Sequence, residues 1–444
     1  MKTMIDQAYI LTMNAKMDVF EDGYLIFEDD TIIEVGQIPP AGFEGRIIHG
    51  KHRLLLPGFV NGHSHLGMIP FRSLGDDCPD RLRRFLFPLE NACMTSELVV
   101  ASTKYAMAEM LLGGVTCVAD MYYFEDAVYK AASEMGMRAL LGETIIDFAT
   151  CDTTRPFGGL EIAQKMAAYP AHPLLRVMIA PHATNTNPKE VLQQVDALSQ
   201  AYQIPWMMHV SEMDYEMQAF EENYAMTPVE YLDHIGVLSS RLIMVHGIHL
   251  TPHDIELMKQ HDVSLIHCIG ANTKAGKGVA PLDQLLAAGV RVGLGTDGPS
   301  SGNTLDLFVQ MRLIPSFQKT WLHDRSIFPA SQVVRLATYG GAEALGLAQQ
   351  IGSLEAGKKA DFILMDMDGV NMFPVHDPYA VLVYSANASN VQEVYVNGNL
   401  LVHEHRLVHQ DLAQLRQNLA SQMTTFSAEA KKRSASLNEE KNIV

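Results

Sequence analysis

The sequence predicts an α/β fold, a (β/α)8 TIM barrel with a small β-sandwich domain built from both chain ends. Two observations lead to this expectation. In the middle of the chain, short hydrophobic segments alternate with longer helical patterns, whereas both ends are rich in short β-type segments. About eight βα units can be distinguished, which is the number in a TIM barrel. A doubly wound open sheet is the alternative, but no Gly-x-Gly-x-x-Gly motif follows the first of these strands.

The two chain ends are expected to form the sandwich. Strands are predicted over residues 8–13, 24–27 and 31–35, followed by a connector rich in Gly, Pro and His over residues 37–51. Near the other end, strands are predicted over residues 361–365, 391–396 and 399–402, and Asn397-Gly398 between the last two is typical of a hairpin turn. We therefore expect residues 1–56 and 346–410 to form the sandwich and residues 57–345 to form the barrel.

The predicted barrel strands are hydrophobic segments separated by helical patterns. They span residues 54–60, 115–121, 138–147, 175–183, 205–212, 242–249, 263–269 and 290–297. The clearest helix covers residues 95–112, which open with Thr95-Ser96-Glu97 and end at Gly113-Gly114, residues suited to cap a helix at each end. Residues 411–444 are predicted to be a polar helical tail, with fraying over residues 428–444.

Composition limits the classes of function. The chain has 444 residues, of which 48% are hydrophobic and 19% charged, so an intrinsically disordered or fibrous protein is excluded. The net charge of −18 argues against nucleic acid and anionic membranes as partners. The sequence has neither an apolar run of the roughly 18 residues that span a bilayer nor a signal-peptide pattern, so we expect a cytoplasmic protein. Five cysteines without a Cys-x-x-Cys pair predict reduced core thiols.

Residues that suit metal binding lie where the predicted strands end. The active site of a TIM barrel is at the C-terminal ends of its strands, so these side chains are expected to meet. His63 and His65 are two residues apart and therefore point to the same face of a strand, and His209 would complete a three-histidine set. Neutral imidazoles around an open coordination position are typical of catalytic zinc sites.

Three more strand-end residues complete the candidate site. Glu212 is a candidate general acid and base, and Asp297 is a candidate ligand that also accepts a proton from bound water. His246 is expected either beside the metal or as a donor that orients the water. Each has a structural alternative, namely a solvated loop carboxylate for Glu212, an Asp-Gly turn residue for Asp297 and a core histidine for His246.

These motifs resemble the amidohydrolase superfamily over nearly the whole chain. The resemblance is carried by residues 57–65, 209–212, His246-Gly247, 295–299 and 351–361. Members with two metals use a modified lysine at the end of the fourth strand, whereas residues 178–182 contain no lysine, which favours one metal. The resemblance implies one Zn²⁺ per subunit, with Fe²⁺ as the alternative, bound by His63, His65, His209 and Asp297. It implies that Glu212 is the proton shuttle and that His246 contacts the water.

Within the superfamily, the chain is most similar to the 5-methylthioadenosine/S-adenosylhomocysteine deaminases and the related chlorohydrolases. Residues 120–123, 136–141 and 278–281 match segments of those deaminases. The resemblance implies that Glu90 binds ribose hydroxyls, that His182 contacts the same part of the substrate, and that Glu212 and His267 also face it. Two departures concern the substrate. The segment 267–272 lacks the family's Pro and Ser, and Arg81, Arg83 and Arg84 occupy a stretch where a Trp-Leu pair is usual. The arginines indicate either a more polar or anionic substrate or an exposed basic helix face.

The sequence therefore predicts a hydrolytic deaminase of an adenosine-type nucleoside, which uses a metal-bound hydroxide and releases ammonia. The alternatives are a chlorohydrolase of a heteroaromatic ring, or a deaminase of guanine, 8-oxoguanine or pterin. Zinc deaminases of the cytidine type are excluded because the Pro-Cys-x-x-Cys motif is missing. A catalytically inactive scaffold is disfavoured because all the implied ligands are present. The expected partners are a small-molecule substrate and further copies of the chain in a homodimer or larger homo-oligomer.

Overall fold

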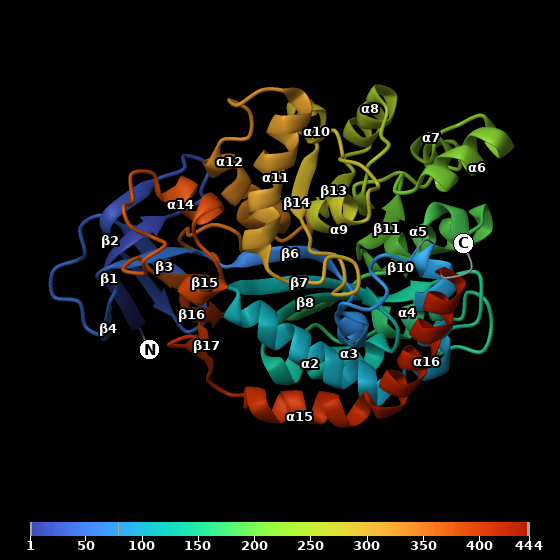
Figure 1. Ribbon diagram of the computed structural model, residues 1–444. Helices are drawn as coiled ribbons and strands as arrows, with labels where there is room; N and C mark the ends of the chain where they lie inside the picture. Colours follow the sequence, from blue (N-terminus) through green and yellow to red (C-terminus); the bar gives the residue numbers. More distant parts are fainter. Residues whose placement is uncertain (1, 79, 442–444) are drawn as a thin grey trace.

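The computed structural model describes residues 2–78 and 80–441. In Figure 1, a β-rich part formed by both chain ends lies beside a larger part made of parallel strands and helices. Within the described residues, the β-rich part is a nine-stranded sheet. Its strands lie in the order β18 (Arg406–Leu407), β17 (Asn399–His403), β16 (Val391–Val396), β15 (Phe362–Asp366), β5 (Arg53–Pro57), β1 (Lys2–Leu11), β2 (Val19–Glu28) and β3 (Thr31–Gly36), and β4 (Arg46–His49) pairs with β1. The antiparallel pairing of β5 with β15 joins the two chain ends.

The larger part contains two parallel sheets. The first comprises β6 (Phe59–Ser64), β7 (Val115–Tyr122), β8 (Arg138–Ile145), β9 (Leu175–Val177) and β10 (Ala180–Pro181), and the second comprises β11 (Trp206–Val210), β12 (Leu242–His246), β13 (Ser264–His267) and β14 (Arg291–Leu294). The backbone N–H of Met207 donates to the carbonyl of Ile179 at 2.8 Å, which links the two sheets on one side. On the other side, the N–H of Asp297 donates to the carbonyl of His63 at 3.1 Å. The parallel strands and the helices between them make a mixed α/β fold of TIM-barrel type.

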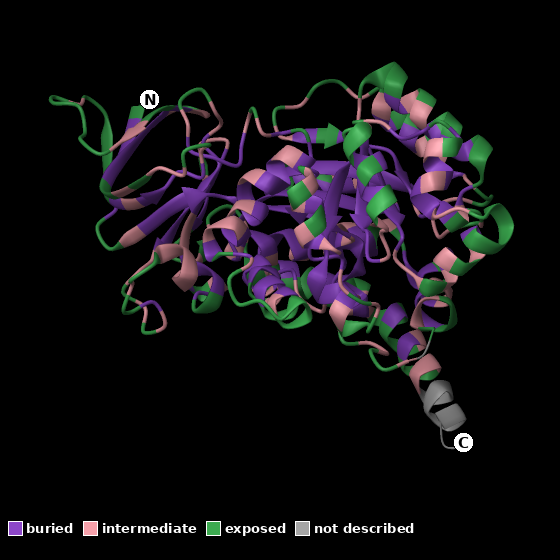
Figure 2. Ribbon diagram, turned by 90° about the horizontal axis from the view of Figure 1, so that it is seen from above, coloured by how far each residue is buried: buried purple, intermediate pink, exposed green. Residues whose placement is uncertain are grey.

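Helices connect and cover the parallel strands. In chain order they are α1 (Phe87–Cys93), α2 (Ser96–Leu112), α3 (Glu125–Met135), α4 (Gly159–Ala167), α5 (Lys189–Tyr202), α6 (Asp214–Tyr224), α7 (Pro228–His234), α8 (Pro252–Gln260), α9 (Ile269–Lys274), α10 (Leu282–Ala288), α11 (Leu307–Leu322), α12 (Ala330–Arg335), α13 (Gly341–Ala344), α14 (Pro378–Tyr384), α15 (Leu412–Gln422) and α16 (Thr424–Lys441). The helix expected over residues 95–112 is confirmed, because the Thr95 hydroxyl caps α2 by accepting from the N–H of Leu98 at 3.3 Å. Figure 2 shows the buried residues concentrated along the strands and the exposed residues on the outer faces of the helices.

The single strand predicted over residues 54–60 is wrong. The chain instead forms β5 in the terminal sheet and β6 in the parallel sheet, with a break at Gly58. A Cβ atom at Gly58 would lie 2.2 Å from the Thr116 side chain, so only glycine allows the backbone to pass this close to β7. Pro57-Gly58 is the sequence signal for the break, but the apolar residues on both sides give no sign of the change of sheet because both strands are buried.

Other boundaries also differ from the predictions. The fourth predicted strand, residues 175–183, is divided into the short strands β9 and β10, and the expected connector over residues 37–51 contains β4. The predicted hairpin turn is confirmed, since Asn397 and Gly398 have φ angles of 51° and 75° between β16 and β17. Cys93, Cys117 and Cys268 are buried, as expected, whereas Cys78 and Cys151 are only partly buried and so do not belong to the core.

The predicted C-terminal tail is helical as far as the structure describes it. It forms α15 and α16, and residues 442–444 lie outside the described residues. The start of α16 packs against the segment that contains Phe71, because Phe426 is buried and the centres of the two rings are 4.7 Å apart. The part of the chain that the structure describes contains no helix that is both long and apolar enough to span a membrane.

Candidate metal centre and active-site cavity

The predicted ligands lie together at the C-terminal ends of the parallel strands. His63 is in β6, His65 directly follows it, His209 is in β11 and Asp297 follows β14. The Nε2 atoms of His63 and His209 are 3.2 Å apart, and the Asp297 carboxylate lies 3.2 Å from His65 Nε2 and 3.9 Å from His63 Nε2. Ligand atoms of His63, His65 and Asp297 all lie within 4.8 Å of one another, as do those of His63, His209 and His246.

Backbone carbonyls fix the orientation of two of these imidazoles. His65 Nδ1 lies 2.5 Å from the Met121 carbonyl, and His209 Nδ1 lies 2.6 Å from the His182 carbonyl. A carbonyl oxygen can only accept, so each Nδ1 carries a proton and donates it, which leaves Nε2 facing the centre. This is the arrangement found at metal sites, where the second ring nitrogen of a ligand is held by an outer acceptor.

The electrostatics of the cluster also suit a cation. Burial lowers the pKa of His63 and of His209 well below that of a free imidazole. Both rings are therefore neutral and can offer a lone pair to a metal ion. Burial would likewise lower the pKa of His65, but the hydrogen bond and charge of Asp297 raise it to about 9. Asp297 therefore stabilises a positive charge at this position, which a metal cation would also supply. The neutral imidazoles of His63 and His209, the position of His65 beside the Asp297 carboxylate and their short separations fit a metal ion such as Zn²⁺.

Glu212 and His246 lie beside this cluster. Glu212 follows β11, and its Oε1 atom is 3.5 Å from His246 Nε2 and 2.5 Å from Lys277 Nζ. Burial would raise the pKa of Glu212, but His246 and Lys277 lower it below its usual range, so the carboxyl group is ionised. His246 ends β12, and its Nδ1 lies 2.8 Å from Asn272 Oδ1.

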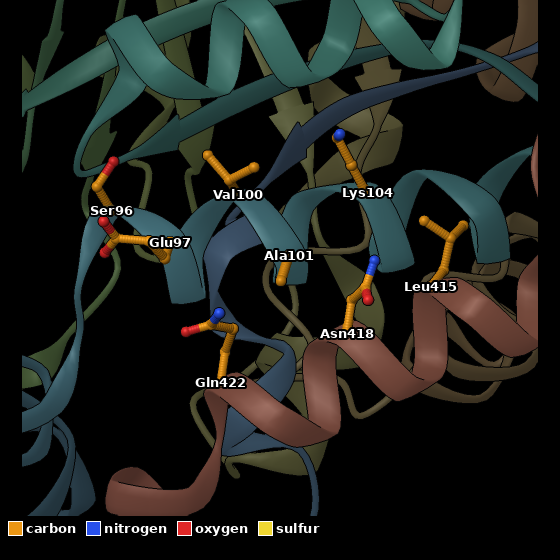
Figure 3. Close-up of a pocket in the computed structure, with 8 residues that line it drawn as sticks. All are labelled: Ser96, Glu97, Val100, Ala101, Lys104, Leu415, Asn418 and Gln422. Atoms are coloured by element: carbon orange, nitrogen blue, oxygen red, sulfur yellow. The ribbon is translucent and has the colours of Figure 1, made fainter.

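A cavity of about 390 Å³ opens onto the cluster. Its walls include the predicted site residues His65, His182, His209, Glu212, His246 and Asp297, together with Phe87 and Tyr215. His63 is fully buried and does not appear among the described residues that line this cavity. A separate hollow of about 320 Å³ lies between α2 and α15. Figure 3 shows the side chains that line it, which are Ser96, Glu97, Val100, Ala101, Lys104, Leu415, Asn418 and Gln422. This second hollow contains none of the predicted site residues.

The predicted substrate residues occupy three different environments. His182 lines the cavity, and its Nδ1 lies 3.1 Å from the Thr186 hydroxyl. Glu90 is buried in α1 and accepts a hydrogen bond of 2.8 Å from the Tyr122 hydroxyl, and burial raises its pKa to about 7. His267 is fully buried, and neither of its ring nitrogens has a hydrogen-bond partner among the described residues. Glu90 and His267 are not among the described residues that line the cavity.

The arginines of the first loop have separate surroundings. The Arg81 guanidinium donates to the Leu74 carbonyl at 2.9 Å and to the Ser300 carbonyl at 2.7 Å, so it holds the loop in place. Arg83 stacks 4.4 Å from the centre of the Tyr215 ring at the cavity wall. Arg81 and Arg83 both line the cavity, and Arg84 is not among its lining residues within the described chain.

Sequence reasoning missed Lys277 and gave no role to Asn272. Lys277 stands between Gly276 and Gly278, whose φ angles of 65° and 119° are disfavoured for other residues. These two glycines were the available signal, because they allow a sharp bend that turns the lysine inward. Asn272 lies in the segment that departs from the family motif, and its contact with His246 became visible only in the structure.

A mixed α/β fold with a metal-suited His/Asp cluster at its strand ends defines a metal-dependent hydrolase. The model of the Amidohydrolase family matches residues 54–401, and the chain belongs to this family. This match and the deaminase relatives described next show that the chain is a hydrolase acting on carbon–nitrogen bonds.

Two bacterial deaminases match almost the whole chain. The 5-methylthioadenosine/S-adenosylhomocysteine deaminase 1 of Syntrophus aciditrophicus is 36% identical over 412 residues, which cover 91% of this chain and 93% of that protein. The 5-methylthioadenosine/S-adenosylhomocysteine deaminase of Thermodesulfovibrio yellowstonii is 34% identical over 421 residues, which cover 92% and 96%.

Solved structures give the same fold. An adenosine deaminase from Xanthomonas campestris with bound zinc superposes with a TM-score of 0.91 at 31% identity, covering 96% of this chain and 98% of that one. An atrazine chlorohydrolase from Arthrobacter aurescens in complex with zinc has a TM-score of 0.88 at 24% identity, covering 95% and 100%. The second likeness is evidence for the fold alone.

Proposed function

We propose that this chain is a metal-dependent aminohydrolase that removes the exocyclic amino group of an adenosine-type nucleoside such as 5-methylthioadenosine or S-adenosylhomocysteine. The observation that carries the proposal is the Glu212 carboxylate at the edge of the His/Asp cluster, inside a cavity large enough for a small ligand. The names of the relatives and of the zinc-containing adenosine deaminase support the substrate class.

We assign the metal site to His63, His65, His209 and Asp297, with one Zn²⁺ per subunit and Fe²⁺ as the alternative. The neutral imidazoles and the carboxylate are donors that both ions accept. When bound, such an ion supplies a Lewis acid that brings the pKa of water down towards about 7. In this assignment His246 stays outside the ligand set, because Asn272 holds its Nδ1 and Glu212 lies beside its Nε2.

The protein groups then move protons around the attacking water. Glu212 takes a proton from the water and gives it to the ring nitrogen next to the carbon under attack. Asp297 and His246 hold the water in line with that carbon, and Asp297 accepts the remaining proton and passes it to the amino group. A carbon–oxygen bond forms, the carbon–nitrogen bond breaks, and the amino group leaves as ammonia after it receives a proton. The product is the corresponding keto ring.

The substrate is proposed to lie in the cavity against His182 and Phe87. The centres of these two rings are 6.0 Å apart, and both residues form part of the cavity wall. Glu90 is proposed to bind the ribose hydroxyls after exchanging its contact with Tyr122. His267 is also proposed to face the substrate, which would require the substrate to reach past the described lining residues, because His267 is fully buried and outside that lining.

We also propose that the parallel strands close into a complete eight-stranded barrel over residues 57–345. The hydrogen bond from Asp297 to the His63 carbonyl, at 3.1 Å, supports this closure. Residues 1–56 and 346–410 are proposed to form the sandwich, and residues 411–444 the helical tail. A cytoplasmic homodimer or larger homo-oligomer is likewise a proposal, which light scattering of the purified protein tests.

A screen for ammonia release tests the function. The panel contains adenosine, 5′-deoxyadenosine, methylthioadenosine, S-adenosylhomocysteine, guanine, 8-oxoguanine and pterin, and atrazine is assayed in parallel for chloride. We expect ammonia from the adenosine derivatives. Glu212→Gln should retain the metal and lose at least about 100-fold in kcat, since general acid–base catalysis contributes about 10²–10⁴-fold. Chloride release without ammonia, or an unchanged kcat in Glu212→Gln, would overturn the proposal.

A further inference from the structure

The segment after β13, whose first residues up to Asn272 depart from the family motif, supplies two contacts to the proposed catalytic groups. It consists of α9, Ile269–Lys274, and the loop that follows it. Asn272 in α9 holds His246 Nδ1 at 2.8 Å, and Lys277 in the loop contacts Glu212 at 2.5 Å. The altered segment is therefore part of the site, although it contributes no predicted ligand.

The backbone of this loop directs Lys277 towards the cavity. The N–H of Lys277 donates to the Asn272 carbonyl at 3.0 Å, which closes the end of α9. Gly276 and Gly278 on either side have φ angles of 65° and 119°, values that other residues rarely adopt. A Cβ atom at Gly278 would also lie 2.9 Å from Ile248 Cγ2, so a larger residue would displace the loop.

The other basic residues of the cavity wall are held elsewhere. Lys274 Nζ contacts Asp76 at 2.7 Å and the Ser301 carbonyl at 3.0 Å. Arg81 is bound to loop carbonyls, and Arg83 stacks on Tyr215. Of the lysines and arginines among the described residues of this wall, Lys277 therefore forms the hydrogen bond to Glu212.

The main chain and the side chain of Glu212 are both restrained. Its N–H donates to Glu216 Oε2 at 2.9 Å, which fixes the backbone where β11 ends. Its Oε1 atom faces Lys277 at 2.5 Å and His246 at 3.5 Å. Because a charge-assisted hydrogen bond is short and strong, the lysine restricts the rotation of the carboxylate. Without the lysine, the carboxylate would be free to turn towards His246.

We propose that Lys277 is a positioning residue, whose ammonium group holds the Glu212 carboxylate in the orientation needed to transfer a proton to the substrate ring. This inference rests on the proposed function, because it assigns the proton transfer to Glu212. It adds a residue that neither the strand-end motifs nor the relatives' names indicate. A small displacement of a reacting group can lower a rate by about 100-fold, which sets the size of the expected effect.

The test compares three variants with the wild-type, metal-loaded enzyme and uses methylthioadenosine as the substrate. Lys277→Met removes the charge at similar length, and Lys277→Arg keeps it. Lys359→Met is the matched control, because Lys359 forms a similar 2.6 Å pair with Asp30 far from the cavity. We expect Lys277→Met to lower kcat by about 30- to 100-fold with KM changed by less than about 3-fold. Lys277→Arg should recover most of kcat, and Lys359→Met should leave kcat unchanged.

Two kinetic results would overturn the proposal. One is a wild-type kcat in Lys277→Met. The other is a loss of kcat that is accompanied by loss of metal or that Lys277→Arg does not rescue, since this would indicate a structural role. Crystal structures of the wild type and Lys277→Met give a readout without activity, because the Glu212 carboxylate should turn towards His246 in the variant. If the wild type releases no ammonia, the proposed function fails, and an unmoved carboxylate in Lys277→Met separately refutes the positioning role.

Discussion

Replacing Arg138 with methionine should strongly destabilise the protein, because Arg138 forms a buried ion pair between β8 and the terminal sheet. Its Nε and Nη2 atoms donate to the two carboxylate oxygens of Asp361 at 2.8 and 2.9 Å. The two side chains are only 3% and 1% exposed. Asp361 also accepts a hydrogen bond of 2.8 Å from the N–H of Asn397 in the hairpin turn. The pair therefore joins three segments that are distant in sequence.

The size of the effect follows from this burial. Removing one partner of a buried ion pair leaves the other charge without compensation and costs about 3–5 kcal/mol. Two charge-assisted hydrogen bonds of about 1.5–3 kcal/mol each give a similar total. We therefore expect Arg138→Met to lower the free energy of unfolding by about 3–5 kcal/mol. Arg155→Met is the control, because Arg155 pairs with Glu161 on the surface, where the side chains are 60% and 73% exposed. An exposed pair contributes about 0–1 kcal/mol.

Urea unfolding monitored by tryptophan fluorescence measures both changes. Trp206 is fully buried in β11, so its emission reports the loss of the parallel sheet. The double variant Arg138→Met/Asp361→Leu should be more stable than Arg138→Met, because it leaves no unpaired buried charge. The reasoning is refuted if Arg138→Met costs less than about 1 kcal/mol, which is the range of a surface pair.

Two further predictions concern the site. His209→Ala should weaken zinc binding by more than about 100-fold, because removing only a group that orients a metal ligand already costs up to about 100-fold. Elemental analysis after dialysis measures the bound metal, and an unchanged metal content would remove His209 from the ligand set. Burial raises the pKa of Glu90 from 4.5 to about 7, so the folded protein holds this proton more tightly than the unfolded chain does. The stability that Glu90 contributes is therefore fully present below pH 4.5 and is lost as the pH rises through about 7. Glu90→Gln should remove this part of the pH dependence. Urea unfolding at pH 5 and pH 7.5 checks it, and the same change in the free energy of unfolding between the two pH values in wild type and variant would contradict the assignment.

The sequence predicted elements well where local patterns determine them. The helix over residues 95–112 has a capping threonine at its start, and the Asn397-Gly398 turn requires positive φ angles, so both were found in place. The strand over residues 54–60 was wrong because the break at Gly58 depends on the approach of Thr116 from another strand. A contact between residues so far apart in the chain leaves no periodic signal near either of them.

In the candidate site, too, local sequence patterns predicted some residues, whereas others depend on contacts between distant parts of the chain. His63, His65, His209 and Asp297 could be predicted to meet, because parallel strands bring their C-terminal ends to one edge, and the structure brings these side chains together. Their roles as ligands stay predictions. Lys277 could not be predicted from strand positions, since it comes from a loop whose course depends on two glycines.

Much of the orientation of the proposed ligands comes from main-chain atoms, which no residue pattern reports. His65 is held by the Met121 carbonyl and His209 by the His182 carbonyl. Met121 lies in β7, whose position is set by the pairing of β6 with β7. His182 directly follows β10, and the isolated parallel bridges Ile179–Trp206 and Ala183–His209 set the position of this segment beside β11. A shift of either pair by one residue would keep every ligand in the sequence and still turn an imidazole away from the centre. The buried apolar residues that fix these registers therefore determine the geometry of the metal site as much as the ligands themselves do.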